Sequence, residues 1–285
     1  MVLKPCSPIQ LCKLALFVLV LLFKITAHSS TTNPMPNFLG VIPARYASSR
    51  FPAKMLAPIA GKSMIRRVYE QCAQAKCLAH LVVATDHPAI EAEVHAFGGQ
   101  VVRTRPDHPS GTDRCHEAWQ LVEGEFSHII NIQGDEPFIQ PSQIDLLAAS
   151  LTDERTELAT LMIRATELAH LTDPGEVKIT FNILHEALYF SRQPIPYLRN
   201  VPLEQWMDHH VFYRHVGIYA YRADILTKIT QLAPSVLEEC EKLEQLRWLE
   251  NGFKIRLVET DQDSFCVESP EDVAKAETFL AAMHR

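Results

Sequence analysis

The sequence lacks the cysteine and histidine patterns of a disulfide scaffold or a zinc site. Its seven cysteines are an odd number at irregular spacings, and no C-x-x-C pair occurs among them, whereas small secreted domains and zinc sites depend on such patterns. The 13 histidines include no H-E-x-x-H spacing, the helical signature of many zinc peptidases. Free thiols in a reducing cytosol are therefore the better interpretation of the cysteines.

The sequence also lacks an excess of positive charge. Lysine and arginine number 27 against 34 acidic residues, which gives a formal net charge of -7. A chain of this charge has no general attraction for nucleic acid or for an anionic membrane surface. We expect no nucleic acid partner, and any polyanionic ligand must meet a local cluster of basic residues.

No repeat, low-complexity tract or Pro/Gly-rich linker divides residues 38–285. Hydrophobic residues make up 47% of the chain, which is enough to fill a core and excludes a disordered protein. We therefore expect one continuous domain over residues 38–285, with a substrate-binding subregion inside it.

An unbroken apolar run, residues 14–23, precedes that domain and is flanked by lysines. A membrane-spanning helix needs about 20 apolar residues, and this run has the length of a signal-peptide core. Three interpretations stay open: a secretory signal, a membrane anchor formed by residues 11–27, or upstream sequence that is absent because translation begins at Met35. Residues 1–37 are predicted to be a hydrophobic extension and linker, so membrane contact depends on whether the extension is retained.

From Phe38 onward, short apolar segments alternate with amphipathic helices. The segments of buried-strand type are residues 38–42, 80–85, 100–104 and 128–133. Helical spacing between them gathers apolar residues on one face, as at Ile65, Val68, Tyr69 and Cys72. This order predicts an α/β fold with a mostly parallel central sheet and helices on both faces.

The second half of the domain is richer in strands. Strand-type runs occupy residues 159–166, 176–182, 187–192 and 215–222, so we expect a mixed, strand-rich subregion. The chain then returns to helix. Ser235 and Glu238 form a capping box before a helix that should run through Leu249, and Ser269-Pro270 begins a last helix.

The loop after the first strand carries a cluster of basic residues. Ligands of a doubly wound sheet bind beyond the carboxyl ends of the strands. There, Arg45, Arg50 and Lys54 lie within ten residues, with Ser48 and Ser49 between them. Three cations and two hydroxyls suit a triphosphate, and flanking prolines favour an ordered binding loop over a solvated one. The loop is not of the Walker type, because G-x-x-x-x-G-K-[ST] is absent.

An acidic residue follows the fourth strand. Residues 131–139 read NIQGDEPFI, so Asp135 stands at the active edge of the sheet behind a glycine that permits close backbone approach. Magnesium bound to phosphates usually takes one or two protein carboxylates and keeps waters. Asp135 is the predicted magnesium ligand, and an aspartate of a simple turn is the alternative.

Residues 105–118 hold a third candidate segment at a junction between loop and helix. Gly111 and Thr112 could offer backbone groups to a base edge, and Arg114 a cation to a carboxylate or phosphate. A helix capped by Thr112 with an acidic first turn explains the same residues. Both interpretations stay open.

Seven segments of the domain together resemble one enzyme family. They are IPARYASSRFPAKML, ATD, SGTDR, NIQGDEP, ALYFSRQPIP, RHVGIYAYR and LEQLRWLENG. The family is that of the 3-deoxy-manno-octulosonate cytidylyltransferases, or CMP-Kdo synthetases, and the resemblance runs from Phe38 to near the C-terminus. Other sugar-activating nucleotidyltransferases share the first loop and the strand-end aspartate, whereas the later segments narrow the resemblance to the Kdo enzymes.

The resemblance implies a Rossmann-like nucleotidyltransferase fold and a reaction. The anomeric 2-hydroxyl of Kdo would attack the α-phosphorus of CTP, pyrophosphate would leave, and CMP-Kdo would form for lipopolysaccharide biosynthesis. The implied cofactor is Mg²⁺, the substrates are CTP and Kdo, and the usual assembly is a homodimer. Because CTP is a cytosolic substrate, we expect a cytoplasmic enzyme, with membrane anchoring through residues 11–27 as the alternative.

The resemblance also assigns roles to residues. The implied catalytic residues are Arg45, Lys54 and Asp135. The implied nucleotide-binding residues are Arg45, Ser48, Arg50, Lys54, Ser110, Gly111, Arg114 and Gln133, of which Arg114 could meet the sugar acid instead. The implied sugar-binding residues are Arg192, His215, Glu244 and Gln245, and the metal ligands are Asp135 and Glu268. The alternatives are a structural salt bridge for Arg192 and a solvated helix face for Glu244.

Two positions depart from the family pattern. An aspartate precedes T-P-E-D in the family as a second metal ligand, whereas Glu268 stands here in V-E-S-P-E-D; its longer side chain can reach Mg²⁺, but octahedral geometry tolerates little displacement. The family's first loop reads P-G-K, whereas Ala53 precedes Lys54 here. If that position requires a positive φ, alanine costs about 1 kcal/mol.

Two rival functions stay open. One is a cytidylyltransferase for a related sugar acid, against which the sugar-side residues argue by resemblance alone. The other is a catalytically silent, membrane-tethered binder of sugar nucleotides, suggested by Glu268, Ala53 and the hydrophobic extension. The retained phosphate cations and Asp135 favour the active enzyme.

Overall fold

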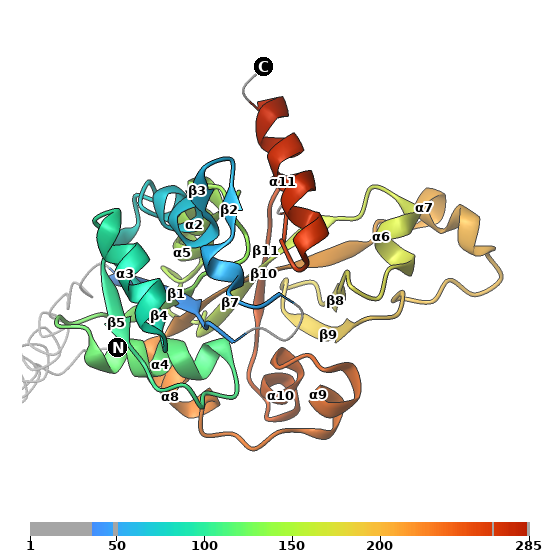
Figure 1. Ribbon diagram of the computed structural model, residues 1–285. Coiled ribbons are helices and arrows are strands. Elements are labelled where there is room, and N and C mark those ends of the chain that lie inside the picture. The colour runs from blue at the N-terminus through green and yellow to red at the C-terminus, as the bar shows by residue number, and fades with distance from the viewer. Residues whose placement is uncertain (1–35, 48–50, 264, 284–285) are drawn as a thin grey trace, which may run out of the picture. The chain divides into compact units, whose positions relative to one another are not determined.

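A nine-stranded mixed sheet forms the centre of the protein (Figure 1). The computed structural model describes residues 36–47, 51–263 and 265–283. The strand order is β11-β7-β10-β6-β1-β4-β5, with β8 paired to β10 and β9 paired to β8. This arrangement confirms the α/β architecture that the alternating pattern predicts.

One half of the sheet is parallel and contains the four strands predicted from the first apolar segments. They are β1 (Phe38–Ala44), β4 (Leu78–Thr85), β5 (Val101–Arg103) and β6 (His128–Asn131). β1 lies between β4 and β6, and β5 pairs with β4. The carboxyl ends of β1 and β6 therefore meet at one edge of the sheet, where the loops that carry Lys54 and Asp135 begin.

The other half is mixed, as the strand-rich pattern predicts. Its strands are β7 (Leu158–Arg164), β8 (Lys178–Phe181), β9 (Ala187–Ser191), β10 (Tyr213–Arg222) and β11 (Arg256–Glu259). β10 runs antiparallel to β6, β7 and β8, whereas β11 pairs with β7 in parallel. A separate small ribbon is formed by β2 (Pro58–Ile59) and β3 (Lys62–Ser63).

Helices cover both faces of the sheet (Figure 1). One face packs against α2 (Met64–Cys72), α3 (Pro88–Ala96) and α5 (Pro141–Ser150). The other packs against α4 (Gly111–Leu121), α8 (Ala223–Ile229) and α10 (Gln245–Glu250), beside which lies α9 (Val236–Glu241). Burial of apolar side chains on both faces is the main force that holds these layers together.

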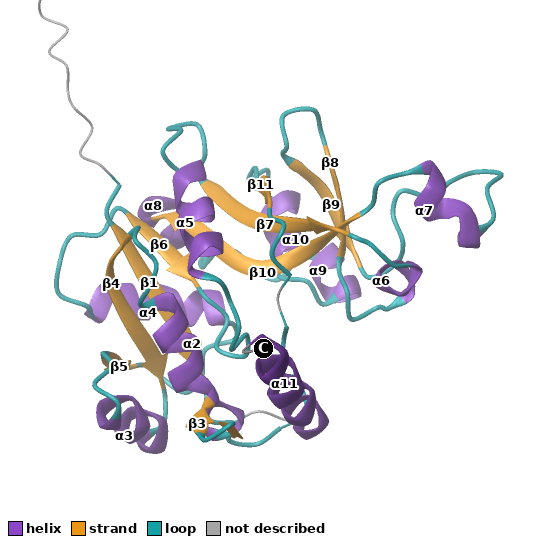
Figure 2. Ribbon diagram, turned by 90° about the horizontal axis from the view of Figure 1, so that it is seen from above, coloured by secondary structure: helices purple, strands orange, loops and turns teal. Residues whose placement is uncertain are grey.

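Two further groups of elements lie beyond these layers. The 3-10 turn η2 (Leu203–Gln205) and the short helices α6 (Leu168–Thr172) and α7 (Trp206–His209) form an arm at the end of the molecule beyond β8 and β9 (Figure 2). The last helix, α11 (Pro270–Met283), packs beside the β2-β3 ribbon and starts where the Ser269-Pro270 signal predicts. Another 3-10 turn, η1 (Lys54–Leu56), follows the first loop.

Two helix predictions need correction. The N-cap of α4 is Ser110, whose hydroxyl accepts a hydrogen bond from the Asp113 amide at 3.2 Å, rather than Thr112. The capping box of Ser235 and Glu238 is present, but the helix ends at Glu241 because Lys242 adopts a left-handed conformation with φ 53°. The expected single helix through Leu249 is therefore two short helices, α9 and α10.

The hydrophobic extension at residues 1–35 lies outside the described residues. Within the part of the chain that the structure describes, no helix combines the length and the apolar character needed to cross a membrane.

Candidate active site

A cavity of about 260 Å³ opens at the carboxyl ends of β1 and β6. Seven of the residues predicted for nucleotide binding and catalysis line it: Arg45, Lys54, Ser110, Gly111, Arg114, Gln133 and Asp135. Two other predicted nucleotide ligands, Ser48 and Arg50, lie outside the described residues, as does the neighbouring Ser49. The structure thus brings residues of three separate loops to one place beyond the sheet edge.

Lys54 and Asp135 form an ion pair in the cavity wall. The Lys54 Nζ donates to the Asp135 Oδ2 at 2.7 Å, and the two side chains are 9% and 24% exposed. Lys54 follows β1 and Asp135 follows β6, and these strands are neighbours in the sheet. Parallel pairing therefore explains why residues 81 positions apart meet here.

The backbone before Lys54 has the left-handed conformation that favours glycine. Ala53 has φ 54° and ψ 27°, and its carbonyl accepts a hydrogen bond from the Leu56 amide at 2.8 Å to start η1. Ala53 therefore has the positive φ that is unfavourable for alanine, which costs the folded state about 1 kcal/mol.

Glycine is required at position 134 because the backbone there lies close to other atoms. A Cβ at Gly134 would lie 3.0 Å from both the Met55 sulfur and the Pro43 carbonyl oxygen.

The two arginines of the cavity differ in how they are held. Arg114 is 3% exposed; its Nη1 donates to the Thr104 hydroxyl at 2.6 Å, and its Nη2 lies 3.5 Å from the Asp86 Oδ2. Burial lowers the pKa of Arg114, and the Asp86 carboxylate opposes that shift. Arg45 is exposed, and no hydrogen bond joins its side chain to another residue that the structure describes. Arg45 is therefore the more available of the two for a phosphate.

The loop before α4 forms the opposite part of the cavity lining. The Ser110 hydroxyl donates to the Asp113 Oδ2 at 2.6 Å. A Cβ at Gly111 would lie 3.4 Å from the Pro43 side chain, so this turn packs closely on the end of β1. His108, which also lines the cavity, is buried and forms a close pair through its Nε2 with the Glu117 carboxylate on α4. These contacts fix the loop that presents Ser110 and Gly111.

Among the predicted sugar-binding residues, His215 lies on β10, the strand that pairs with β6. Tyr219 pairs with Asn131, the last residue of β6, so the part of β10 before Tyr219 extends beyond the sheet edge at which the cavity opens. A Cβ at Gly217 would lie 3.6 Å from the Gln133 side chain. The strand that carries His215 therefore adjoins the nucleotide cavity directly.

His215 lies in an aromatic environment. Its ring centroid is 5.4 Å from that of Phe190 and 5.2 Å from that of Tyr219, and its Nε2 lies 2.9 Å from the Thr160 hydroxyl. Burial lowers the pKa of His215 to about 3, so the imidazole is neutral at pH 7. A neutral imidazole can donate or accept a hydrogen bond, as recognition of a sugar hydroxyl requires.

The Arg192 guanidinium binds main-chain carbonyl oxygens. Its Nε donates to Glu241 at 2.7 Å and its Nη1 to Pro174 at 2.8 Å, and its Nη2 lies 3.5 Å from the Lys242 oxygen. The Glu241 carboxylate meanwhile accepts the Arg192 amide at 2.9 Å. These contacts tie the end of β9 to the end of α9, so Arg192 has a structural role beside its predicted one. Its sugar-binding role stays a prediction.

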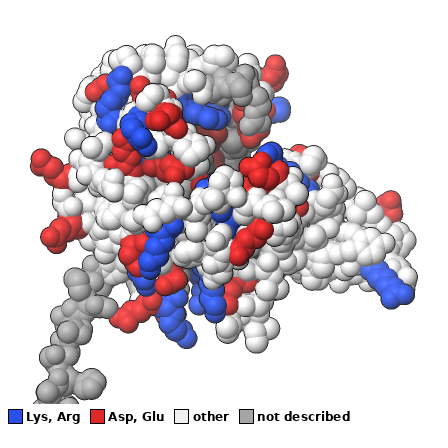
Figure 3. All heavy atoms as spheres, turned by 90° about the horizontal axis from the view of Figure 1, so that it is seen from below, with Lys and Arg blue, Asp and Glu red and all other residues white. Residues whose placement is uncertain are grey.

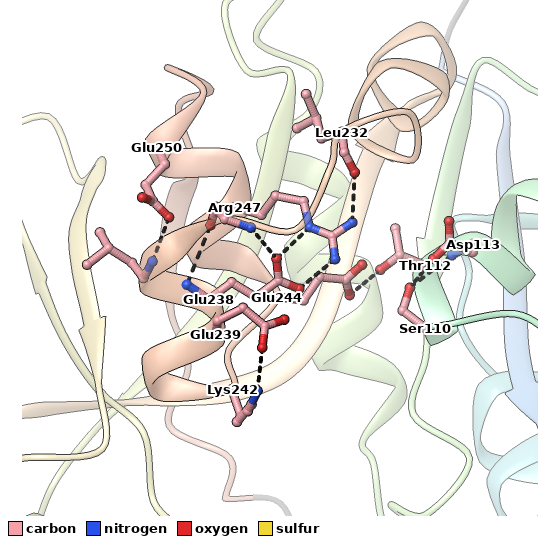
Figure 4. A network of polar contacts seen from close by, with 12 residues as sticks. Ser110, Thr112, Asp113, Leu232, Glu238, Glu239, Lys242, Glu244, Arg247 and Glu250 are labelled. Carbon is pink, nitrogen blue, oxygen red and sulfur yellow. Dashed lines mark hydrogen bonds and ion pairs between the residues drawn. The ribbon is translucent and has the colours of Figure 1, made fainter.

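Glu244 and Gln245 lie at the start of α10, close to the first turn of α4 (Figure 4). The Thr112 hydroxyl donates to the Glu244 Oε2 at 2.8 Å, and burial raises the pKa of Glu244, an effect that hydrogen bonds from Thr112 and Ser110 partly offset. Glu244 thus belongs to an internal polar network, unlike a residue on a solvated helix face. Gln245 is 5% exposed.

The predicted metal ligands come from two segments joined by a backbone hydrogen bond. The Val267 amide donates to the Asp135 carbonyl at 2.9 Å, which places Glu268 beside the Asp135 segment. No group of three or more His, Cys, Asp or Glu side chains that could hold a metal ion occurs among the described residues. A pair of carboxylates fits a Mg²⁺ ion that takes its other ligands from phosphates and water.

Sequence reasoning missed several residues of the site. Asp86 anchors Arg114 and accepts the Tyr46 amide at 3.1 Å, and its place at the end of the second strand was a usable signal. Tyr219 contacts both His215 and Trp248, at ring distances of 5.2 and 5.1 Å, and joins β10 to the helix that carries Glu244. No sequence pattern indicates such a contact.

Comparison with known proteins identifies the family. A cytidylyltransferase family model matches residues 39–255. The 3-deoxy-manno-octulosonate cytidylyltransferase of Parabacteroides distasonis is 50% identical over 251 residues, which cover 87% of this chain and 99% of that protein. The enzyme of the same name from Cytophaga hutchinsonii is 51% identical over 240 residues, which cover 84% and 96%.

Solved structures show the same relationship. CMP:2-keto-3-deoxy-manno-octonic acid synthetase, complexed with CTP, matches with a TM-score of 0.80 and 42% identity over 87% of this chain and 99% of that chain. A 4-diphosphocytidyl-2C-methyl-D-erythritol synthase from Anaerococcus prevotii, at 12% identity and a TM-score of 0.58, shares the fold alone, with coverage of 86% and 96%. The chain therefore belongs to the 3-deoxy-manno-octulosonate cytidylyltransferase family.

Proposed function

We propose that the protein transfers CMP from CTP to 3-deoxy-D-manno-octulosonate (Kdo) and releases pyrophosphate, as a step of lipopolysaccharide biosynthesis. The observation that carries this proposal is the Lys54–Asp135 pair, 2.7 Å apart in the wall of the cavity beyond β1 and β6. A cation and a carboxylate in that position suit a triphosphate and its metal ion. The names of the relatives favour this activity over another sugar acid and over a silent binder.

The reaction exchanges one bond to phosphorus for another. The anomeric 2-hydroxyl oxygen of Kdo forms a bond to the α-phosphorus of CTP, and its proton is lost to solvent. The bond between the α-phosphorus and the bridging oxygen breaks, and its electron pair leaves with pyrophosphate. Because this transfer requires little covalent chemistry from the protein, positioning and charge neutralisation supply most of the rate acceleration.

In our proposal, three basic residues of the cavity position the triphosphate and neutralise its charge. The Lys54 ammonium is already held at the cavity wall by Asp135, so little is lost in ordering it when the triphosphate binds. Arg45 is exposed and supplies a second positive charge. Arg114, fixed by Thr104 and Asp86, contributes its charge from a set position in the lining.

We propose that Asp135 and Glu268 hold Mg²⁺. When bound, the ion would neutralise negative charge on the phosphates of CTP. The fit rests on the all-oxygen donor set and on the hydrogen bond that joins the two segments. Treatment with EDTA is expected to stop pyrophosphate release, and added Mg²⁺ to restore it. Release that continues undiminished in EDTA would contradict the metal proposal.

A pyrophosphate-release assay with three sugar conditions tests the function. The full chain is incubated with CTP, Mg²⁺ and either Kdo, a sialic acid or no sugar. We expect release with Kdo alone. Release with the sialic acid but not with Kdo would replace the proposed substrate by another sugar acid. CTP binding without release in any condition would favour the silent binder.

We propose that the enzyme is a homodimer, formed through the β8-β9 hairpin and the arm. Apolar side chains are exposed at the tip of the β8-β9 hairpin, where Ile183 is 97% exposed, on β9, where Leu188 is 60% exposed, and after β9, where Tyr197 is 75% exposed. Next to them lies a hollow of about 690 Å³, lined by Phe181, Met207 and other residues. The arm also carries few charges on the face that Figure 3 presents. A second copy of the chain would cover this apolar surface.

Sedimentation of wild-type protein and of Ile183→Asp tests the dimer. We expect wild type at twice the mass of one chain, and a shift toward monomer in the variant, because a buried aspartate opposes association. Val236→Asp, at an apolar residue of α9 that is 74% exposed and lies outside the arm, is a matched control that should remain dimeric. A wild-type protein that sediments as a monomer at micromolar concentration would refute the proposal.

We propose that catalysis takes place in the cytoplasm, where CTP is available. The hydrophobic extension decides whether the enzyme is also tethered to a membrane. N-terminal sequencing of the native protein separates the interpretations: a first residue at Met35, or at the residue after it, would show that the extension is upstream sequence. A native chain that begins at Met1 and sediments with membranes would support the anchor instead.

A further inference from the structure

Thr112 connects the two sides of the site, although the resemblance assigns its side chain no role. It follows Ser110 and Gly111, which line the nucleotide cavity, and it lies in the first turn of α4. Its side chain is 2% exposed, and its hydroxyl donates to the Glu244 Oε2 at 2.8 Å. One hydrogen bond therefore joins the nucleotide-side turn to a residue predicted to bind the sugar, 132 positions away in the chain.

The helix that carries Glu244 is braced from its other side. Arg247 forms a bidentate pair with Glu238, through its Nε at 2.6 Å and its Nη2 at 2.5 Å, and its Nη1 donates to the Leu232 carbonyl at 3.1 Å (Figure 4). This pair fixes α10 against α9. It does not set the direction of the Glu244 carboxylate, which points toward Thr112 in the close view (Figure 4).

Because the Glu244 carboxylate lies largely away from water, the hydrogen bond that the Thr112 hydroxyl donates to it is important. Burial raises the pKa of Glu244, so each hydrogen bond that the ionised carboxylate accepts has to offset a loss of hydration. A carboxylate of this kind can accept a second hydrogen bond from a sugar hydroxyl if its orientation is fixed. Loss of the Thr112 donor would leave the carboxylate both less stable and less well oriented.

We propose that Thr112 is a positioning residue for the sugar acid, whose hydroxyl orients the Glu244 carboxylate from the same turn that lines the nucleotide cavity. The inference rests on the proposed function, because it takes Glu244 to contact the sugar. It assigns Thr112 no contact with the reacting atoms. Its role is to tie the sugar side of the site to the nucleotide side.

Steady-state kinetics of Thr112→Val tests this role. Valine keeps the shape of threonine and removes the hydroxyl. We expect the KM for Kdo to rise about tenfold, as for loss of a hydrogen bond to a charged group, while the KM for CTP stays within about twofold of wild type. Thr112→Ser keeps the hydroxyl and should restore the KM for Kdo. Thr227→Val, on the adjacent helix α8, is a matched control that should change neither constant.

A double variant shows whether Thr112 acts through Glu244. Glu244→Gln alone is expected to raise the KM for Kdo, and adding Thr112→Val should raise it no further, because the two changes disrupt one interaction. Fully additive effects would overturn the proposal. If Thr112→Val fails to fold, Thr112→Ala takes its place with the same expected result.

The outcomes separate this inference from the proposed function. An active wild type together with an unchanged KM for Kdo in Thr112→Val overturns the positioning role alone. Equal increases in KM for CTP and for Kdo also overturn it, because they indicate general loosening of the site. A wild type that releases no pyrophosphate with Kdo overturns the proposed function, and the positioning role with it.

Discussion

The two sides of the site are organised in different ways. On the nucleotide side, charged groups face a cavity and pair with each other, as Lys54 does with Asp135, or lie exposed, as Arg45 does. On the sugar side, polar groups are already bonded to the protein, as His215 is to Thr160 and Glu244 to Thr112. Apart from Arg114, which Thr104 and Asp86 hold in place, the nucleotide side is thus arranged to exchange partners, whereas the sugar side holds recognition groups in fixed orientations.

This difference predicts different costs of substitution. Charges kept ready for a ligand contribute mainly to catalysis, and their removal should change turnover much more than the free energy of unfolding. Groups held by internal hydrogen bonds contribute to both, so their removal should also change stability and its pH dependence. The following predictions test that contrast, from the largest expected effect to the smallest.

Asp135→Asn should have the largest effect on turnover. It removes one negative charge at the proposed metal site, and several kcal/mol of transition-state stabilisation corresponds to a loss of kcat on the order of 10³-fold. The fold should remain intact, because the amide oxygen can still accept from Lys54. Pyrophosphate release and circular dichroism measure the two quantities. Turnover like that of wild type would refute the metal role of Asp135.

Lys54→Met should reduce kcat/KM for CTP by roughly 10²-fold, because it removes a cation that neutralises the triphosphate. Lys62→Met is the matched control: Lys62 pairs with Glu70 on the protein surface at 2.6 Å, and its loss should leave kcat/KM within about twofold of wild type. Equal losses of kcat/KM in the two variants would show that the cavity lysine is no more important for CTP than a surface lysine.

His215→Asn should change how stability depends on pH. The pKa of His215 is about 3 in the folded protein and about 6.5 for an unfolded histidine, so the unfolded chain binds an extra proton between these values. Wild type should then lose at most about 1.4 kcal/mol of unfolding free energy per pH unit from this group as pH falls from 6.5 toward 3. The variant should lack that contribution.

Urea unfolding of both proteins at a series of pH values measures the His215 contribution as a difference. Parallel stability curves for wild type and His215→Asn below pH 6.5 would show that the imidazole is not held neutral by its surroundings. His215 would then contribute no pH dependence to stability, and the predicted contrast between the two sides would fail at this residue.

Ala53→Gly should stabilise the loop before Lys54. Glycine adopts φ 54° without the steric cost that alanine pays, so the free energy of unfolding should rise by about 1 kcal/mol. Ala57→Gly, at a residue with φ -60°, is the opposite control and should destabilise slightly. A fall in the melting temperature of Ala53→Gly would mean that alanine makes contacts worth more than the strain.

Glu268→Asp should have the smallest effect. It restores the shorter aspartate side chain of the family pattern, and we expect kcat to stay equal to wild type or to improve by about twofold. Mg²⁺ titration of the activity measures the change. Complete loss of activity would mean that the site has adapted to the longer side chain.

Much of the nucleotide side could be predicted because sheet topology determines it. Lys54 and Asp135 each follow a buried apolar strand, and neighbouring parallel strands bring their carboxyl ends to one edge. Ser110 and Gly111 lie at the start of α4, which the sequence marks only to within two residues, and their place at the site was implied by the resemblance. The pattern of strands and helices is therefore sufficient to bring Lys54 and Asp135 together.

The sugar side could not be predicted in the same way. The Thr112–Glu244 contact depends on the break between α9 and α10, which a left-handed Lys242 makes in a segment whose capping box predicts one continuous helix. Lysine has no special preference for that conformation. The Arg192 guanidinium likewise binds carbonyl oxygens at a helix end, and main-chain acceptors leave no mark in a sequence. Both features depend on tertiary packing.

The most direct test of the account follows the phosphorus atoms of CTP. CTP labelled at the α-phosphorus or at the γ-phosphorus is incubated with the protein, Mg²⁺ and Kdo, and the products are separated. We predict that the α-label appears in a product that contains both CMP and Kdo, and the γ-label in pyrophosphate. A γ-label in inorganic phosphate or in a phosphorylated sugar would contradict transfer of CMP to Kdo.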